Sequence, residues 1–217
     1  MPRKKYHHGD LKNTLIKAGM EIISKEGLGG LSLRKVAKKA GVSHTAPYAH
    51  FTDKLALIAA ISTEGYRRLF VQISAAVESN HNDPQHLLVE VGWAYIQFAL
   101  KDPKLFKVMF SGVIEQEKDY PDFREMAQKN FQLLVTLVKT GQEAGLLAPA
   151  SPDLVAVRLW SLVHGFIMLL LEGQISHTLL DRMSIRELLV FMVNDIPKTE
   201  IAFDEIHPIT PKGLIKS

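Results

Sequence analysis

Hydrophobic residues recur at intervals of three, four and seven through most of the chain. In residues 10–26 they form one stripe, Leu11, Leu15, Ala18, Ile22 and Ile23, which predicts an amphipathic helix that ends at Gly27. Similar spacing predicts helices over residues 32–40, 52–80, 84–100, 104–110, 122–144, 152–175 and 184–194. No window combines alternation of period two with β-branched residues, so we expect an all-α fold.

Residues 31–54 carry the most specific local pattern. Ser32 can cap a short helix, and Gly41 suits a turn because it tolerates a positive φ. The helix between them is amphipathic: Leu33, Val36, Ala37 and Ala40 face inward, and Arg34, Lys35, Lys38 and Lys39 face outward. Ser43 begins a second, very short helix, and Thr52-Asp53 begins the next one.

That second helix is too short to bury much core, so its polar side chains need another explanation. Insertion into the major groove of DNA provides one, because the second helix of a helix-turn-helix enters the groove with its N-terminus first. We expect His44, Thr45 and Ala46 to lie nearest the base edges. Tyr48 and His50 suit phosphate contacts, while Pro47 stiffens the first turn and Phe51 fills the core.

The charge distribution agrees with a polyanion-binding head. Residues 1–54 contain eleven Lys or Arg and four Asp or Glu, a balance of +7, whereas the whole chain has a formal charge of only +3. The remainder is therefore acidic, with a balance of −4. Basic charge gathered at one end of an acidic protein is typical of nucleic-acid binding. A merely well-solvated helix surface is the alternative.

The segment from Ser43 to Lys54 resembles the recognition helix and following helix start of the TetR/AcrR family of bacterial transcriptional regulators, and the match extends back to Gly9-Asp10-Leu11. Ala49 departs from the pattern, since a larger polar residue is frequent there. Downstream, the Trp160…His164-Gly165 segment resembles the Trp-His-Gly type of C-terminal domain. The resemblance implies a three-helix helix-turn-helix head followed by a helical bundle for ligand binding and dimerisation.

With that resemblance we divide the chain into a basic arm (1–8), a DNA-binding domain (9–69, with the motif at about 32–51), a ligand-binding and dimerisation domain (70–196) and an extension (197–217). Helices 152–175 and 184–195 are the expected interface of a homodimer, with Leu162 and Phe166 as candidate contacts. The arm follows the DNA backbone or enters a minor groove, and a solvated terminus is the alternative. The candidate DNA contacts are Lys5, Ser32, Arg34, Ser43, His44, Thr45, Ala46, Pro47, Tyr48, His50 and Lys54.

Residues 70–196, the body of the protein, contain many large, flexible apolar side chains, and this composition predicts a cavity for an apolar or aromatic effector. His164 is a polar group in the middle of the most apolar helix and could orient such a ligand. A filled aromatic core is the alternative. The candidate ligand contacts are Trp93, Phe106, Met109, Phe110, Trp160, His164 and Met168.

Other classes of protein lack their signatures. There is no cysteine, no phosphate-binding Gly loop and no His cluster with metal-ligand spacing, and Glu-x-x-His occurs once, from Glu78 to His81, where a di-iron site needs it twice. We therefore expect no catalytic site, no cofactor and no metal. The basic N-terminus is not followed by an apolar run, and the most apolar window, residues 159–171, is too short for a bilayer. We expect a cytoplasmic, ligand-responsive repressor that binds a palindromic DNA operator. The alternatives are a ligand-responsive activator, or an adaptor or ligand carrier that retains the helix-turn-helix domain but does not bind DNA.

Overall fold

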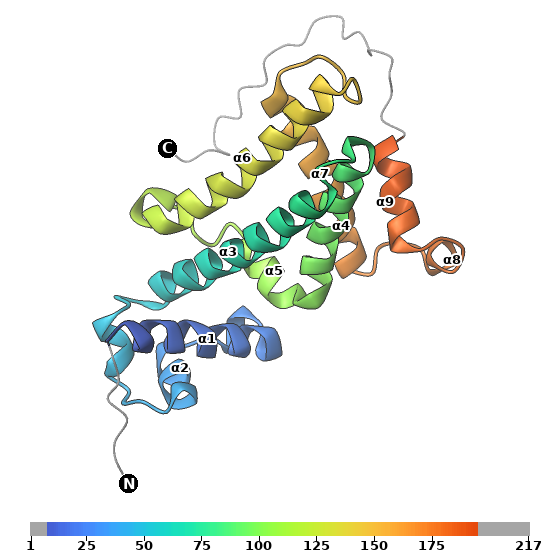
Figure 1. Ribbon diagram of the computed structural model, residues 1–217. Coiled ribbons are helices and arrows are strands. Elements are labelled where there is room, and N and C mark those ends of the chain that lie inside the picture. Colours follow the sequence, from blue (N-terminus) through green and yellow to red (C-terminus); the bar gives the residue numbers. More distant parts are fainter. Residues whose placement is uncertain (1–7, 195–217) are drawn as a thin grey trace, which may run out of the picture.

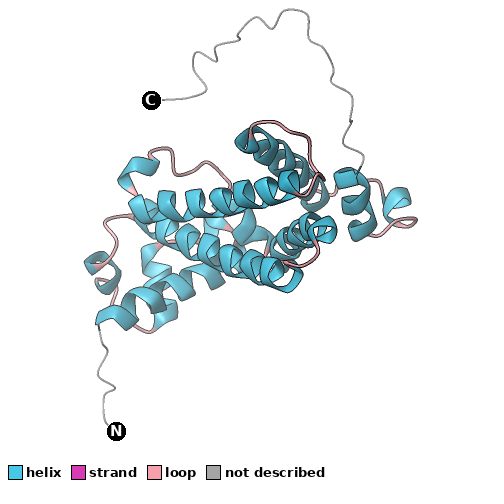
Figure 2. Ribbon diagram, turned by 45° about the horizontal axis from the view of Figure 1, so that its top comes forward, coloured by secondary structure: helices cyan, strands magenta, loops and turns pink. Residues whose placement is uncertain are grey.

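The computed structural model describes residues 8–194 and contains helices, turns and loops but no strand within that range (Figures 1 and 2), which confirms the all-α prediction. Its helices are α1 (His8–Glu26), α2 (Leu33–Ala40), α3 (Lys54–Asn80), α4 (Pro84–Lys101), α5 (Pro103–Met109), α6 (Pro121–Glu143), α7 (Pro152–Leu171), α8 (His177–Leu180) and α9 (Ile185–Asn194). Short 3₁₀ turns occupy Leu28–Gly30, Ala46–Ala49 and Glu117–Asp119.

The head consists of α1, α2, the Ala46–Ala49 turn and the first part of α3 (Figure 1). Leu15 and Ile23 of α1 are fully buried, as are Val36 of α2 and Leu57 of α3. These side chains belong to one hydrophobic cluster, so burial of their apolar surface holds the three helices together.

The body is built around the rest of α3, which runs out of the head and lies among α4, α5 and α6 (Figure 1). Behind them α7 packs against α6 and α4, and α9 packs against α4. Fully buried Ile96, Phe106, Val138, Ile167 and Leu189 mark the interior. Because α3 is continuous, the expected domain boundary at residues 69/70 falls inside one helix rather than in a linker.

The structure corrects two of the expected elements and adds one that was not expected. The second helix of the motif is a turn followed by four residues of 3₁₀ helix, with Pro47 at its start. The helix predicted over 152–175 ends at Leu171, because Gly173 adopts a left-handed φ of 66° and Gln174 N–H donates back to the Leu169 carbonyl. The short α8 was not predicted, since four residues carry too little periodicity.

By length and composition, α7 is the one helix within residues 8–194 that could cross a membrane. The thirteen-residue apolar window therefore underestimated it, since the helix has 20 residues. In the fold, Val155 and Leu159 pack against Val135 and Val138 of α6. A core helix of a globular domain passes the same length test. The basic arm up to residue 7 and the extension after residue 194 lie outside the described residues.

Candidate DNA-binding surface and ligand cavity

Local contacts fix the start and end of α2 as the sequence predicts. The Ser32 hydroxyl accepts a hydrogen bond of 3.2 Å from the Lys35 backbone N–H, which satisfies one of the free donors of the first turn. At the other end Gly41 has a φ of 69°, and the Val42 N–H donates to the Ala37 carbonyl at 3.0 Å. This is the bond pattern that closes a helix at a glycine. It turns the chain toward the next segment.

The recognition segment, residues 43–50, leaves this turn with most of its side chains exposed. The hydroxyls of Ser43 and Thr45 lie 3.1 Å apart, and the Tyr48 N–H donates to the Thr45 carbonyl at 3.1 Å. His44 and Thr45 are exposed, and Tyr48 exposes 55% of its surface. An aromatic side chain with this much exposed surface contributes little to the core and is available to a partner.

The remaining predicted DNA contacts divide by exposure. Ser32, Arg34 and Lys54 are exposed, and the Lys54 ammonium donates to the Leu28 carbonyl at 3.3 Å. Ala46 is half-buried. Pro47 is fully buried, so its side chain shapes the turn and does not face a groove. Lys5 lies outside the described residues.

His50 is half-buried, and its Nε2 is buried without a hydrogen-bond partner in the described part of the chain. Its ring lies 6.4 Å from that of Phe51. Phe51 is only 3% exposed, which confirms that it fills the core of the head. His50 is thus positioned at the junction between the core and the exposed side of the segment.

The positive charges of α2 are not equally available. Lys35 pairs with Glu26 of α1, and Lys39 pairs with Glu21 at 2.6 Å. The hydrogen bond and charge of Lys39 lower the pKa of Glu21. Arg34 and Lys38 are exposed, and no ion pair involves them within residues 8–194. These two cations are therefore free to meet phosphates beside the recognition segment.

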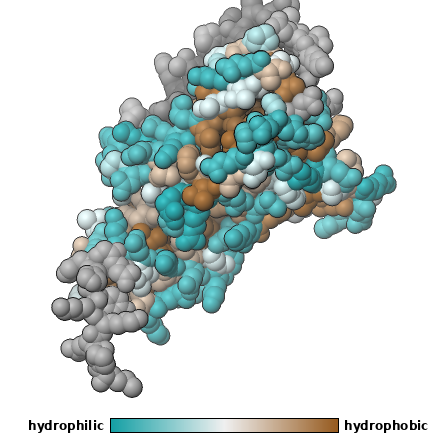
Figure 3. All heavy atoms as spheres, viewed as in Figure 1, coloured by the Kyte–Doolittle hydropathy of each residue, from teal (hydrophilic) through white to brown (hydrophobic). Residues whose placement is uncertain are grey.

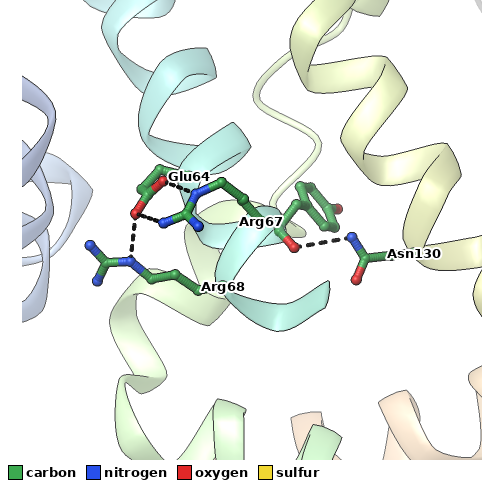
Figure 4. A network of polar contacts seen from close by, with 5 residues as sticks. Glu64, Arg67, Arg68 and Asn130 are labelled. Carbon is green, nitrogen blue, oxygen red and sulfur yellow. Dashed lines mark hydrogen bonds and ion pairs between the residues drawn. The ribbon is translucent and has the colours of Figure 1, made fainter. Parts of the chain in front are cut away.

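The helix that links head and body begins directly after this surface. Asp53 caps α3 by accepting a 2.8 Å hydrogen bond from the Ala56 N–H. Further along, Glu64 accepts hydrogen bonds from Arg67 and Arg68 on its own helix (Figure 4), and they lower the pKa of its carboxyl group. Such pairs three and four residues apart stabilise the exposed side of a helix.

A cavity of about 140 Å³ lies in the body between α3, α4, α6, α7 and α9. In the space-filling view, hydrophobic residues gather on the upper half of the molecule, which the body forms (Figure 3). Apolar side chains form most of the wall, and no charged residue belongs to it. The lining residues are Tyr66, Leu69, Ile73, Leu88, Val91, Gly92, Tyr95, Phe110, Ala127, Asn130, Phe131, Leu134, Leu137, Leu159, Trp160, Val163 and Val193.

A chain of three polar groups runs along one side of the cavity. The Trp160 indole N–H donates to the Tyr95 hydroxyl oxygen at 3.2 Å, and that oxygen lies 2.8 Å from Nδ1 of His164. Burial lowers the pKa of His164, which favours the neutral ring that accepts this hydrogen bond. Burial also raises the pKa of Tyr95, so its hydroxyl keeps its proton.

The structure places only part of the predicted ligand set at this cavity. Phe110 and Trp160 line it, and His164 reaches it through Tyr95. Phe106 and Met109 are buried core residues away from the wall. Trp93, whose ring lies under the Arg186 guanidinium, and the half-buried Met168 are also outside the lining. These four side chains therefore agree with the alternative, a filled aromatic core.

The sequence interpretation missed the polar wall residues Tyr66, Tyr95 and Asn130. Asn130 could have been noticed, because it shares one helical face with the apolar residues Ala127, Phe131 and Leu134. A polar side chain on an apolar stripe is the unusual observation that signals a site. Among the described residues there is no group of His, Cys, Asp or Glu arranged to hold a metal ion.

Comparison with known proteins connects both regions to one class of regulator. Residues 15–61 match the family model of bacterial regulatory proteins of the tetR family, and residues 88–193 match that of the tetracyclin repressor-like C-terminal domain. The second match does not assign the Trp-His-Gly type, which stays a prediction.

Individual relatives are similar over most of their length. An uncharacterized HTH-type transcriptional regulator, YobS of Bacillus subtilis, is 27% identical over 165 residues, which are 75% of this chain and 80% of the relative. The HTH-type transcriptional repressor BepR of Brucella suis is 26% identical over 184 residues, 80% of this chain and 87% of the relative. A solved structure of a protein with unknown function from Rhodococcus sp. RHA1 has a TM-score of 0.75 at 29% identity and covers 88% of this chain and 96% of its own. With a match in each domain, the chain belongs to the tetR family of bacterial regulatory proteins.

Proposed function

We propose that this protein is a cytoplasmic, ligand-responsive repressor that binds a palindromic DNA operator as a homodimer. The observation that carries the proposal is the continuity of α3. This helix begins at Lys54, directly after the recognition segment, and its residues Tyr66, Leu69 and Ile73 line the cavity in the body. A molecule in the cavity therefore touches the same rigid element that supports the DNA-binding surface. The repressor BepR among its relatives supports the negative sign of regulation.

The mechanism follows from that connection. Operator binding by two heads requires a fixed separation of the recognition segments, about one turn of the double helix. A ligand that binds more tightly when α3 is displaced favours a separation that does not match the operator. It releases DNA in proportion to its difference in affinity for the two states.

The surface of α7 supports the homodimer. Leu154 exposes 70%, Val157 45% and Leu169 50% of its surface, although these are apolar side chains on a long helix. Gly165 lies on the same helix, and a Cβ atom built there would meet nothing within 4 Å. A second copy of the chain would bury this apolar surface, and the small Gly165 would allow its helix to approach closely. Phe166 cannot be a partner contact, because it is 7% exposed and belongs to the core.

Selection from a pool of random double-stranded DNA tests the function. The full chain should select a sequence with two-fold symmetry, and footprinting should show two protected half-sites about one helical turn apart. Selection of no sequence would favour an adaptor that does not bind DNA. A reporter gene behind the selected site then separates a repressor from an activator, since repression predicts higher expression when the regulator is absent.

A further inference from the structure

Among the described residues that line the cavity, Asn130 has a buried polar atom without a hydrogen-bond partner, its Oδ1. The amide nitrogen of this side chain donates to two backbone carbonyls, that of Tyr66 at 3.1 Å and that of Met126 at 2.8 Å. Because both partners are acceptors, the nitrogen must face them, and the orientation of the amide is fixed. Figure 4 shows the nitrogen of Asn130 directed at α3 and its oxygen turned away.

That oxygen is buried and has no hydrogen-bond partner within residues 8–194. A buried acceptor without a donor is unfavourable, and such an atom in a native protein needs an explanation. Asn130 belongs to the lining of the 140 Å³ cavity, but Oδ1 itself is covered, so a donor on a bound molecule reaches it only after a small shift of the wall. The other polar groups of the wall are already engaged, since Tyr95 bonds both Trp160 and His164 and the Tyr66 hydroxyl donates to the Met109 carbonyl at 3.3 Å.

The size and charge of the cavity limit what that molecule can be. An apolar cavity of about 150 Å³ is large enough to hold benzene. A space of about 140 Å³ therefore fits one ring or a short branched chain. No charged side chain lines the wall, and burying an unpaired charge is strongly unfavourable. The ligand must be uncharged.

We propose that the effector is an uncharged, apolar compound of single-ring size that donates one O–H or N–H group to Oδ1 of Asn130. This inference rests on the proposed ligand-responsive function and specifies the chemistry of its ligand. It also connects recognition to the response, because the same amide holds the Tyr66 carbonyl of α3. A donor at Oδ1 fixes the Asn130 side chain and thereby the position of α3 next to the cavity.

Calorimetric titration with three compounds of equal size tests the inference. Phenol carries a donor, whereas toluene and fluorobenzene have no proton to donate. We expect the ratio of phenol affinity to toluene affinity to fall about tenfold in Asn130→Leu, the effect of losing one buried hydrogen bond. Gln72→Leu is the matched control. The Gln72 side chain also ties α3 to a neighbouring helix, by donating to the Ala94 carbonyl at 2.8 Å, but it does not line the cavity.

An unchanged ratio in Asn130→Leu would overturn the inference, and so would a failure of all three compounds to bind. Should Asn130→Leu not fold, the wild-type chain still decides, because phenol must bind it more tightly than fluorobenzene. Operator binding is measured in the same samples. If toluene releases the operator as well as phenol does, the donor is wrong but the ligand-responsive regulator stands. If the chain binds no operator at all, the proposed function itself fails.

Discussion

The hydroxyl of Tyr95 on α4 lies 2.8 Å from Nδ1 of His164 on α7, and the two rings are inclined by only 28°. This contact joins two helices of the cavity wall through a histidine, whose pKa is lowered by burial. A neutral His164 accepts the Tyr95 proton at Nδ1, whereas a protonated ring cannot. Protonation of His164 would therefore reverse this hydrogen bond: the ring would donate to the Tyr95 oxygen, which already accepts from Trp160, and the Tyr95 proton would lose its acceptor.

The first prediction is that the free energy of unfolding falls as the pH is lowered below about 6.5. Burial lowers the pKa of His164 in the folded state, below the ordinary value of about 6.5 that holds in the unfolded chain. The unfolded chain then binds the proton first, so stability is complete above pH 6.5 and is lost as the pH approaches the folded pKa. The limit for one proton is about 1.4 kcal/mol per pH unit, and the half-buried ring keeps the effect below it.

Urea denaturation between pH 5 and 8 measures this dependence. His164→Gln should flatten the curve below pH 6.5, since glutamine does not titrate. His177→Gln, at an exposed position of α8, is the control and should keep the slope of the wild type. Equal slopes for the wild type and His164→Gln would show that His164 does not couple to folding.

The second prediction concerns the salt dependence of DNA binding. Lys54 is exposed at the start of α3, where phosphates are attracted to the helix N-terminus. Lys54→Ala should lower the magnitude of the slope of log K against log salt by about one unit per half-site, with similar losses on specific and random DNA. Lys139→Ala, an exposed lysine of α6, is the control and should leave the slope unchanged. Equal slopes for both variants would remove Lys54 from the interface.

The sequence predicted best where local chemistry decides the structure. The Ser32 cap and the Gly41 turn depend on residues within one helical turn, and both form as expected. Phe51 is predicted to fill the core of the three-helix head, and it is buried.

The cavity was harder to predict, because its wall depends on how five helices pack. Phe106 and Phe110 lie four residues apart in the same apolar segment, yet only Phe110 lines the cavity. Periodicity shows which face of a helix is apolar, but not where two apolar faces leave a space. The recognition segment deviated for another reason: with Pro47 at its start, the segment forms bonds of the 3₁₀ type between Thr45 and Tyr48.

The third prediction tests the turn between α2 and the recognition segment. Gly41 has a φ of 69°, and a Cβ atom there would meet nothing within 4 Å. The cost of Gly41→Ala is therefore conformational strain rather than a clash, and we expect a loss of about 1 kcal/mol in the free energy of unfolding. Gly41→Asn should lose less, because asparagine tolerates the left-handed region. Gly29→Ala is the matched control, since its site is equally open without a positive φ. Thermal denaturation of the three variants compares them, and equal losses at both glycines would contradict this account.

The last prediction tests the dimer through the exposed face of α7. Leu169 exposes half of its surface in the single chain, so replacing it by Glu costs a monomer little stability. In a dimer the same carboxylate would be buried against the partner helix without a compensating charge, which is strongly unfavourable. We expect Leu169→Glu to sediment as a monomer at micromolar concentration, to keep its helical circular dichroism and to lose tight binding to a two-fold symmetric site. Val71→Glu is the control, because Val71 on α3 is 56% exposed but lies outside the proposed interface. A dimeric Leu169→Glu variant, or an equal loss of association in Val71→Glu, would show that the two copies do not meet through this face of α7.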